Sequence, residues 1–101
     1  MNFQRSNVKL IKYNSQEFYQ ACQLRYNLFF APHSLPQDIV LDPNQADYFH
    51  AAMTIKNTVV AYGQLVPHPN QIYQICQMVV VTAYQRQNLG TALLLFLIQI
   101  A

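Results

Sequence analysis

Apolar and polar positions alternate at the start of the chain and then adopt a helical spacing. Residues 7–13 alternate and predict a short strand. Asn14 and Ser15 follow, with Glu17 shortly after, and this pattern predicts a helix start, because a polar side chain there accepts a bond from a first-turn N–H group. The helix is expected to continue to about Phe30. Its buried stripe is predicted to consist of Phe18, Ala21, Cys22, Arg25, Leu28 and Phe29, with Gln16, Gln20, Gln23 and Asn27 facing water.

Prolines interrupt the helical pattern over residues 31–44, which predicts a loop with at most one short helical turn. Two strands are expected next, over residues 48–55 and 58–66. Lys56 and Asn57 lie between them, and two central residues that include Asn favour a tight hairpin. Pro67 is expected to end the second strand, because proline has no N–H group for a sheet ladder.

The last part of the chain is the most apolar. Residues 71–81 predict a third consecutive strand that becomes continuously apolar from Met78, which is typical of a strand covered on both faces. Residues 91–101 predict a buried helix, since this run is shorter than the roughly 20 residues that span a membrane. The element order indicates the α+β class, with a mostly antiparallel, mixed sheet flanked by helices in one domain over residues 1–101.

Composition excludes several classes of function. The chain is 52% hydrophobic and 10% charged, with a formal net charge of +2, and its six Lys and Arg residues are too dispersed for a nucleic-acid interface. Residues 1–6 carry no apolar stretch, so no signal peptide, no membrane association and a cytoplasmic location are expected. The residues that commonly bind metals show no ligand spacing, and no metal site is predicted. They are Cys22, Cys76, His33, His50 and His68.

The segment best suited to chemistry is residues 78–94, a buried strand that leads through a polar turn into a helix N-terminus. First-turn N–H groups and the helix dipole favour an anion at such a junction. Residues 85–90 would form a phosphate-binding loop, in which Gly90 lets a ligand approach the backbone and Arg86 adds positive charge.

The sequence of residues 80–94, VVTAYQRQNLGTALL, resembles the acetyl-CoA-binding motif of the GNAT N-acetyltransferase superfamily. That motif has Gln or Arg, two residues, Gly, one residue, then Gly or Ala. Gln85 matches its first position and Gly90 its last. Asn88 replaces the first glycine, and asparagine is the mildest non-glycine choice for a left-handed backbone position. Thr82 replaces a common proline.

The resemblance implies an acyl-CoA N-acyltransferase-like fold, of which this chain would be the N-terminal two thirds, truncated after the cofactor-binding helix. It also implies acetyl transfer from acetyl-CoA to a small-molecule or peptide amine. Backbone groups of Met78, Val79 and Val80 would pair with the pantetheine arm, and an amide near Val80 would polarise the thioester carbonyl. The pyrophosphate would contact Gln85, Arg86, Gln87, Asn88, Leu89, Gly90 and Thr91.

No catalytic residue can be named from the sequence. The strand before the motif offers Tyr73, Gln74 and Gln77 but no carboxylate. His50 is a conceivable base, with a packed or surface histidine as the alternative. The acceptor pocket is expected near residues 25–42, whose polar side chains are Arg25, Tyr26, Asp38 and Asp42; a solvated loop is the alternative.

Three hypotheses follow for the function. The first is an acetyl-CoA-dependent N-acetyltransferase. One form of this hypothesis is that the short chain has no activity by itself. The second is a non-catalytic truncated module that binds CoA or self-associates, and the third is an unrelated α+β interaction module. We expect the chain either to pair with another copy, as a homodimer, or to expose its final helix.

Overall fold

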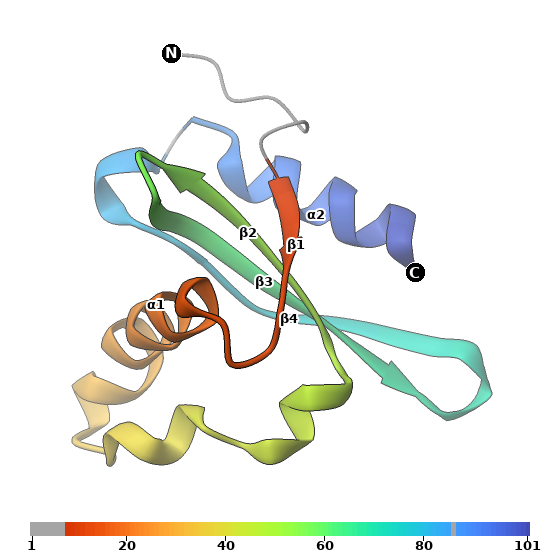
Figure 1. Cartoon of the computed structure of the whole chain (residues 1–101), viewed down its shortest axis with the longest axis horizontal. Helices are drawn as coiled ribbons and strands as arrows, with labels where there is room; N and C mark the ends of the chain where they lie inside the picture. Colours follow the sequence, from red (N-terminus) through yellow and green to blue (C-terminus); the bar gives the residue numbers. More distant parts are fainter. Residues whose placement is uncertain (1–7, 86) are drawn as a thin grey trace.

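The computed structural model describes residues 8–85 and 87–101. Four strands form one sheet in the order β1-β2-β3-β4, and all three pairings are antiparallel. Two α-helices accompany them (Figure 1). In chain order the elements are β1 (Val8–Ile11), α1 (Gln16–Arg25), β2 (Phe49–Ile55), β3 (Thr58–His68), β4 (Ile72–Val80) and α2 (Leu89–Ile100). The predicted order of elements is confirmed.

Helix α1 starts where the sequence predicted. The Ser15 side chain caps it by accepting a hydrogen bond of 3.1 Å from the backbone N–H of Phe18. After Arg25 the backbone continues as a π-helical turn over Tyr26–Phe30. A π turn holds more residues than an α turn and rotates the following side chains off the stripe. Leu28 is therefore 50% exposed, and its predicted burial was wrong.

The proline-rich segment contains more local structure than predicted. It forms three 3-10 turns, Ala31–His33, Gln37–Val40 and Pro43–Asp47, instead of at most one. The carboxamide of buried Gln45 donates hydrogen bonds to the carbonyls of Val40 (2.7 Å) and Asp42 (3.0 Å). These bonds connect successive turns. Gln64 Nε2 of β3 donates to Gln45 Oε1 at 2.8 Å, and this bond holds the segment against the sheet.

The β2–β3 hairpin confirms the predicted tight turn, because Lys56 and Asn57 both have positive φ angles (51° and 65°). The predicted end of β3 was wrong, since the strand continues through Pro67 to His68. Strand β2 begins at Phe49, opposite Leu65, so β3 beyond that point has a neighbour on only one side. Proline is tolerated at such an edge because its missing N–H group costs no ladder bond there.

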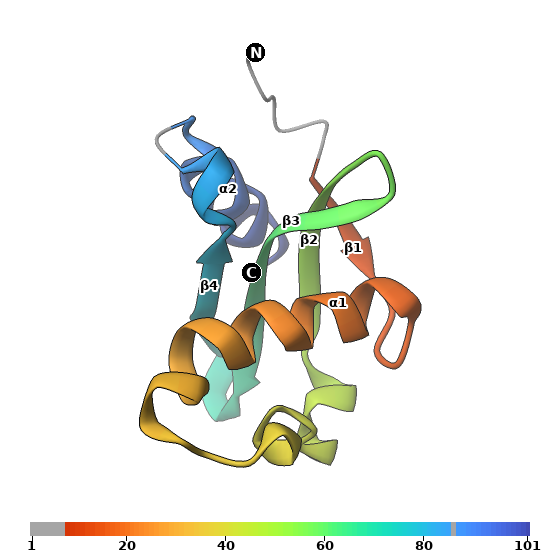
Figure 2. The same cartoon turned by 90° about the vertical axis from the view of Figure 1, so that its left-hand side faces the viewer.

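The two α-helices cover opposite faces of the sheet, as Figure 2 shows. Against α1, the buried core includes Phe18 and Tyr62, exposed by 1% and 0%. Against α2, it includes Leu65, Leu93 and Leu97, all with 0% exposure. The expectation that α2 is buried holds for one of its faces only, because Leu94, Leu95 and Ile98 are 40–52% exposed.

Strand β4 contains a bulge that changes which side chains face α1. Gly63 of β3 lies between the pairs Tyr62–Val79 and Gln64–Cys76, so two β4 residues, Gln77 and Met78, occupy the space opposite this single glycine. Gln77 has a positive φ of 56°. The consecutive side chains of Cys76 and Gln77 consequently both lie on the α1 face, where they contact Gln64 and Arg25 respectively.

Gly63 provides a test of this packing. A Cβ atom at Gly63 would lie 2.8 Å from Met78 Sδ and 3.1 Å from Leu97 Cδ1. We expect Gly63→Ala to lower the free energy of unfolding by about 1–2 kcal/mol, because both side chains must shift in a close-packed core. Urea unfolding measures the change, and an equal or higher stability of the variant would contradict the close approach of β3 to α2.

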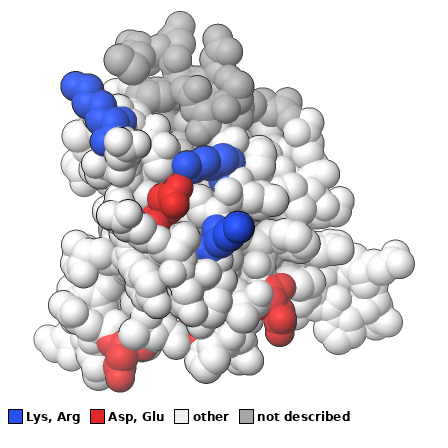
Figure 3. All heavy atoms as spheres, viewed as in Figure 1, with Lys and Arg blue, Asp and Glu red and all other residues white. Residues whose placement is uncertain are grey.

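Charged side chains are sparse and interspersed on the face shown in Figure 3. One ion pair joins Lys9 Nζ and Glu17 Oε2 at 2.7 Å, and this contact lowers the pKa of the Glu17 carboxyl. Within residues 8–85 and 87–101, no helix has the length and apolar character needed to cross a bilayer.

Candidate functional site

The open edge of β4 presents unpaired backbone groups. Val80 is the register partner of Ala61, and the N–H of the next residue, Val81, donates to Val60 O at 2.8 Å. Successive residues of an antiparallel strand direct their N–H and C=O groups to opposite sides. The N–H and C=O of Val80 therefore point away from β3, toward the open edge. The Val80 carbonyl accepts a bond of 3.1 Å from Gln85 Nε2, whereas the N–H of Val80 has no acceptor in the part of the chain that the structure describes.

A cleft of about 240 Å³ lies beside this edge. One wall is the end of α1 with the π turn, and the other is the end of β4 with the turn that follows. Its lining is Leu24, Asn27, Leu28, Val79, Val80, Val81, Thr82 and Gln85. Leu28, which the π turn leaves exposed, is part of this wall. An extended chain with amide groups fits such a cleft, because the walls are mostly apolar and the strand edge can form hydrogen bonds.

The N-terminus of α2 lies one turn further along the chain. Asn88 precedes the helix in the left-handed conformation (φ 63°, ψ 20°), the conformation that its place in the motif implied. Its side chain makes no capping bond. The first intrahelical bond runs from Ala92 N to Asn88 O (3.0 Å), and the N–H groups of residues 89–91 have no backbone or side-chain acceptor among the described residues.

Gly90 has no packing role that would require glycine. Its φ is not positive, and a Cβ atom placed on it would meet nothing within 4 Å. Glycine in a helix lowers the stability of the fold relative to alanine. The open space above Gly90 is therefore kept at the expense of some folding stability. Gln87 is half-buried beside it. Arg86, the charged residue predicted for this loop, lies outside the described residues.

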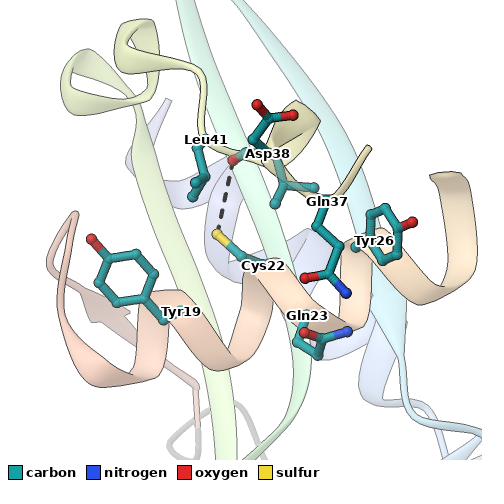
Figure 4. A pocket seen from close by; sticks show the side chains of 8 residues that line it. Tyr19, Cys22, Gln23, Tyr26, Gln37, Asp38 and Leu41 are labelled. Atoms are coloured by element: carbon teal, nitrogen blue, oxygen red, sulfur yellow. Dashed lines mark hydrogen bonds between the residues drawn. The ribbon is translucent and has the colours of Figure 1, made fainter. Parts of the chain in front are cut away.

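The predicted polar residues of the acceptor region are separated by the structure into two hollows. Tyr26 and Asp38 line a groove of about 400 Å³ between α1 and the 3-10 turns, where Cys22 Sγ contacts Val40 O at 3.9 Å (Figure 4). The Tyr26 hydroxyl donates to Leu35 O (2.6 Å), so it is already used within the fold. No sheet residue lines this groove, and it lies away from the open edge of β4.

Arg25 and Asp42 line the second hollow, a cavity of about 300 Å³ on the α1 face of the sheet. We call it the bulge cavity, because the bulged part of β4 forms one wall. Its lining is Arg25, Phe30, Ile39, Asp42, Gln45, Tyr48, Gln64, Val66, His68, Gln74, Cys76 and Gln77. Most of these residues could not be assigned to a site from the sequence, because only the bulge and the folded loop bring them together.

His50 is a packed residue. It is 2% exposed; its Nδ1 contacts the Tyr62 hydroxyl at 2.6 Å and its Nε2 contacts the Gln45 carbonyl at 2.8 Å. With Nε2 donating to the carbonyl, Nδ1 accepts from the hydroxyl and the ring is neutral. Burial lowers the pKa of His50 and raises that of Tyr62. Both ring nitrogens are occupied, so the packed alternative holds and His50 is not available as a base.

The lowered pKa of His50 predicts a pH dependence of stability. Below its ordinary value of 6.5, the unfolded chain binds a proton that the folded chain excludes. The free energy of unfolding should therefore rise with pH through this window and level off above about 6.5. Unfolding curves between pH 5 and 8 measure the slope, which His50→Gln should reduce and which a substitution of exposed His33 to Gln should leave unchanged. An unchanged slope in the His50 variant would refute the assignment.

Comparisons with known proteins identify a family and a fold. A family model described as "Acetyltransferase (GNAT) family" matches residues 12–101. Among solved structures, an aminoglycoside 6'-N-acetyltransferase complexed with coenzyme A has a TM-score of 0.76 at 14% identity. An acyl-CoA N-acyltransferase from Pseudomonas aeruginosa has a TM-score of 0.76 at 22% identity. ElaA from Escherichia coli has a TM-score of 0.74 at 21% identity.

The matches cover nearly all of this chain but a smaller share of each matched protein. They cover 92%, 93% and 92% of this chain, respectively, but only 53%, 68% and 67% of those proteins. The chain thus spans about half the length of the aminoglycoside acetyltransferase. No curated protein matches the sequence significantly.

Proposed function

Because this chain belongs to the acetyltransferase (GNAT) family, we propose that it binds acetyl-CoA along the open edge of β4 and takes part in acetyl transfer to an amine. The single observation that carries the proposal is the N–H of Val80, which has no acceptor among the described residues and lies beside a mostly apolar cleft. A solved relative with the same fold holds coenzyme A, which supports a CoA-type cosubstrate here.

The pantetheine arm is the part of the cosubstrate that suits the cleft. Its methylene groups would contact Leu24 and Leu28, and its amides would pair with the strand edge at Val80. The Gln85 side chain already bonds the Val80 carbonyl, so it must move or share that acceptor when the arm binds. The pyrophosphate would accept bonds from the N–H groups of residues 89–91 at the positive end of α2, with open space above Gly90.

Acetyl transfer needs few side chains at this site. The amine nitrogen attacks the thioester carbonyl carbon, so a C–N bond forms, the C–S bond breaks and the CoA thiolate leaves. The nitrogen loses a proton and the thiolate gains one. A preorganised strand N–H such as that of Val80 would stabilise the negative charge on the carbonyl oxygen in the transition state.

Leu28 and Leu41 form a matched pair for testing the cleft. They are exposed by 50% and 49%, but Leu28 lines the cleft beside β4 and Leu41 lines the separate groove outside α1. We expect Leu28→Ala to weaken acetyl-CoA binding about fivefold, because a ligand that covers this side chain buries apolar area. Leu41→Ala should leave the affinity unchanged. Isothermal titration measures both, and equal effects, or no binding by the unaltered chain at millimolar acetyl-CoA, would overturn the proposal.

A CoA-binding module without catalysis is the second candidate. It is favoured by the poor supply of carboxylates, because among residues 8–85 and 87–101 Asp42 is the one carboxylate lining the bulge cavity, and it accepts a bond from Asn44 N (2.9 Å). Release of CoA thiol in the presence of an amine panel separates the candidates. Binding without amine-dependent release would support the module.

A further inference from the structure

Arg25 carries a buried charge that forms no ion pair with the described residues. It is the last residue of α1 and is 5% exposed. Within residues 8–85 and 87–101, no carboxylate lies within 4 Å of its guanidinium. The ion pair found in these residues joins Lys9 and Glu17 and does not involve Arg25. Burying a cation without an anionic partner is costly. An anionic ligand that reached Arg25 would offset this cost.

The guanidinium is held in place but has donors to spare. Its Nε donates to Gln77 Oε1 (3.2 Å), its Nη1 contacts Cys22 Sγ (3.9 Å), and its Cζ lies 5.4 Å from the centre of the Tyr62 ring. Nη2 has no acceptor among the described residues. Since every buried side-chain nitrogen and oxygen of these residues has a partner, Nη2 must reach the accessible surface. Arg25 lines the bulge cavity, so a ligand bound there lies beside this side chain.

The rest of the bulge cavity suits an anion with an apolar body. Four of its polar side chains are neutral carboxamides, and Phe30, Ile39 and Val66 add apolar surface. The carboxylate of Asp42, which also lines the cavity, accepts a bond from Asn44 N (2.9 Å). The position of the cavity is equally informative. Gln77 belongs to its wall and Val79 belongs to the cleft proposed for acetyl-CoA, two residues further along the same strand. A molecule bound at Arg25 therefore lies next to the place where the acetyl group would be presented.

We infer that the bulge cavity binds the acceptor and that Arg25 recognises a carboxylate on it. The substrate class is then a small amine that also bears a carboxylate and an apolar side chain, such as an aliphatic or aromatic amino acid. The guanidinium Nη2 donates to the carboxylate, and the amine points toward Val80. This assignment of the substrate class rests on the proposed acetyl transfer, whereas carboxylate binding at Arg25 can be measured without it.

The test compares carboxylates with carboxamides of the same shape. Acetate, 4-methylpentanoate and phenylacetate are titrated into the ¹⁵N-labelled chain, alongside the three matching carboxamides, while the Arg25 Nε–H and Gln77 side-chain resonances are followed. We expect the carboxylates to shift both resonances with millimolar affinity, and the carboxamides to bind at least about tenfold more weakly, because a charge-assisted bond is lost. Equal binding of both series, or no shift by any carboxylate at 100 mM, overturns the inference.

Variants separate recognition from a purely structural role of Arg25. Arg25→Lys keeps the charge and should retain a weaker preference for carboxylates, whereas Arg25→Gln should lose it. If neither variant folds, the comparison of carboxylates with carboxamides on the unaltered chain still decides. Acetyl-CoA titrated into the same sample gives an independent readout at Val80 and Gln85. Loss of that signal alone would refute the proposed function, and loss of the carboxylate signal alone would refute the role of Arg25.

Discussion

Leu97→Ala is expected to lower the free energy of unfolding by about 2–5 kcal/mol. Leu97 is 0% exposed in the core between α2 and the sheet, next to Gly63 of β3. Truncation removes buried methyl groups and leaves a cavity that the neighbouring strand can fill only in part. A loss of this size is a large fraction of the 5–15 kcal/mol by which most native proteins are stable.

The adjacent residue is the control for this prediction. Ile98 follows Leu97 on the same helix but is 52% exposed. Ile98→Ala should change stability by less than about 1 kcal/mol, since the removed atoms are largely in contact with water. Urea unfolding of the two variants measures the difference. Equal losses would contradict the orientation of α2, and a larger loss for Ile98 would place the opposite face of the helix against the sheet.

Features of the fold that depend on neighbours in sequence were predictable. Ser15 caps α1 because a hydroxyl three residues before a free N–H can reach it, and this geometry is local. Lys56 and Asn57 form the hairpin turn for a similar reason. The continuously apolar end of β4 indicated cover on both faces, and the structure places α1 and α2 on opposite sides of it.

The wrong predictions concern features that the local sequence pattern does not determine. Pro67 stays within β3 because β2 has already ended at that level of the sheet, which the sequence of β3 does not reveal. The burial of Leu28 was overestimated because the helix widens into a π turn after Arg25. The turns of the proline-rich segment are held by Gln45, whose role requires the folded loop.

The candidate site divides in the same way. The strand, turn and helix that contain Gln85, Asn88 and Gly90 are contiguous, so their motif was legible in the sequence. The bulge cavity was not, because Arg25 and Gln77 meet across 52 residues and a bulge turns Gln77 toward α1. The sequence contained one indication of the bulge cavity, which was an arginine on the predicted buried stripe of a helix.

Gly90→Ala should affect stability and ligand binding in opposite directions. The Cβ atom enters open space within a helix, so the free energy of unfolding should rise by about 0.5–1 kcal/mol. The same methyl group occupies the space proposed for the pyrophosphate, next to the N–H groups of residues 89–91. We expect the affinity for acetyl-CoA to fall about tenfold, equivalent to roughly 1.4 kcal/mol, as a close contact is forced apart.

This opposition is what makes Gly90 informative. A residue retained for folding alone would show no loss of ligand affinity when its replacement stabilises the helix. Thermal unfolding without ligand and isothermal titration with acetyl-CoA measure the two quantities on the same sample. Exposed Leu95 of the same helix provides the control, because Leu95→Ala should leave the affinity unchanged. A stabilised Gly90→Ala chain that binds acetyl-CoA as tightly as the original would exclude the α2 N-terminus from the cosubstrate site.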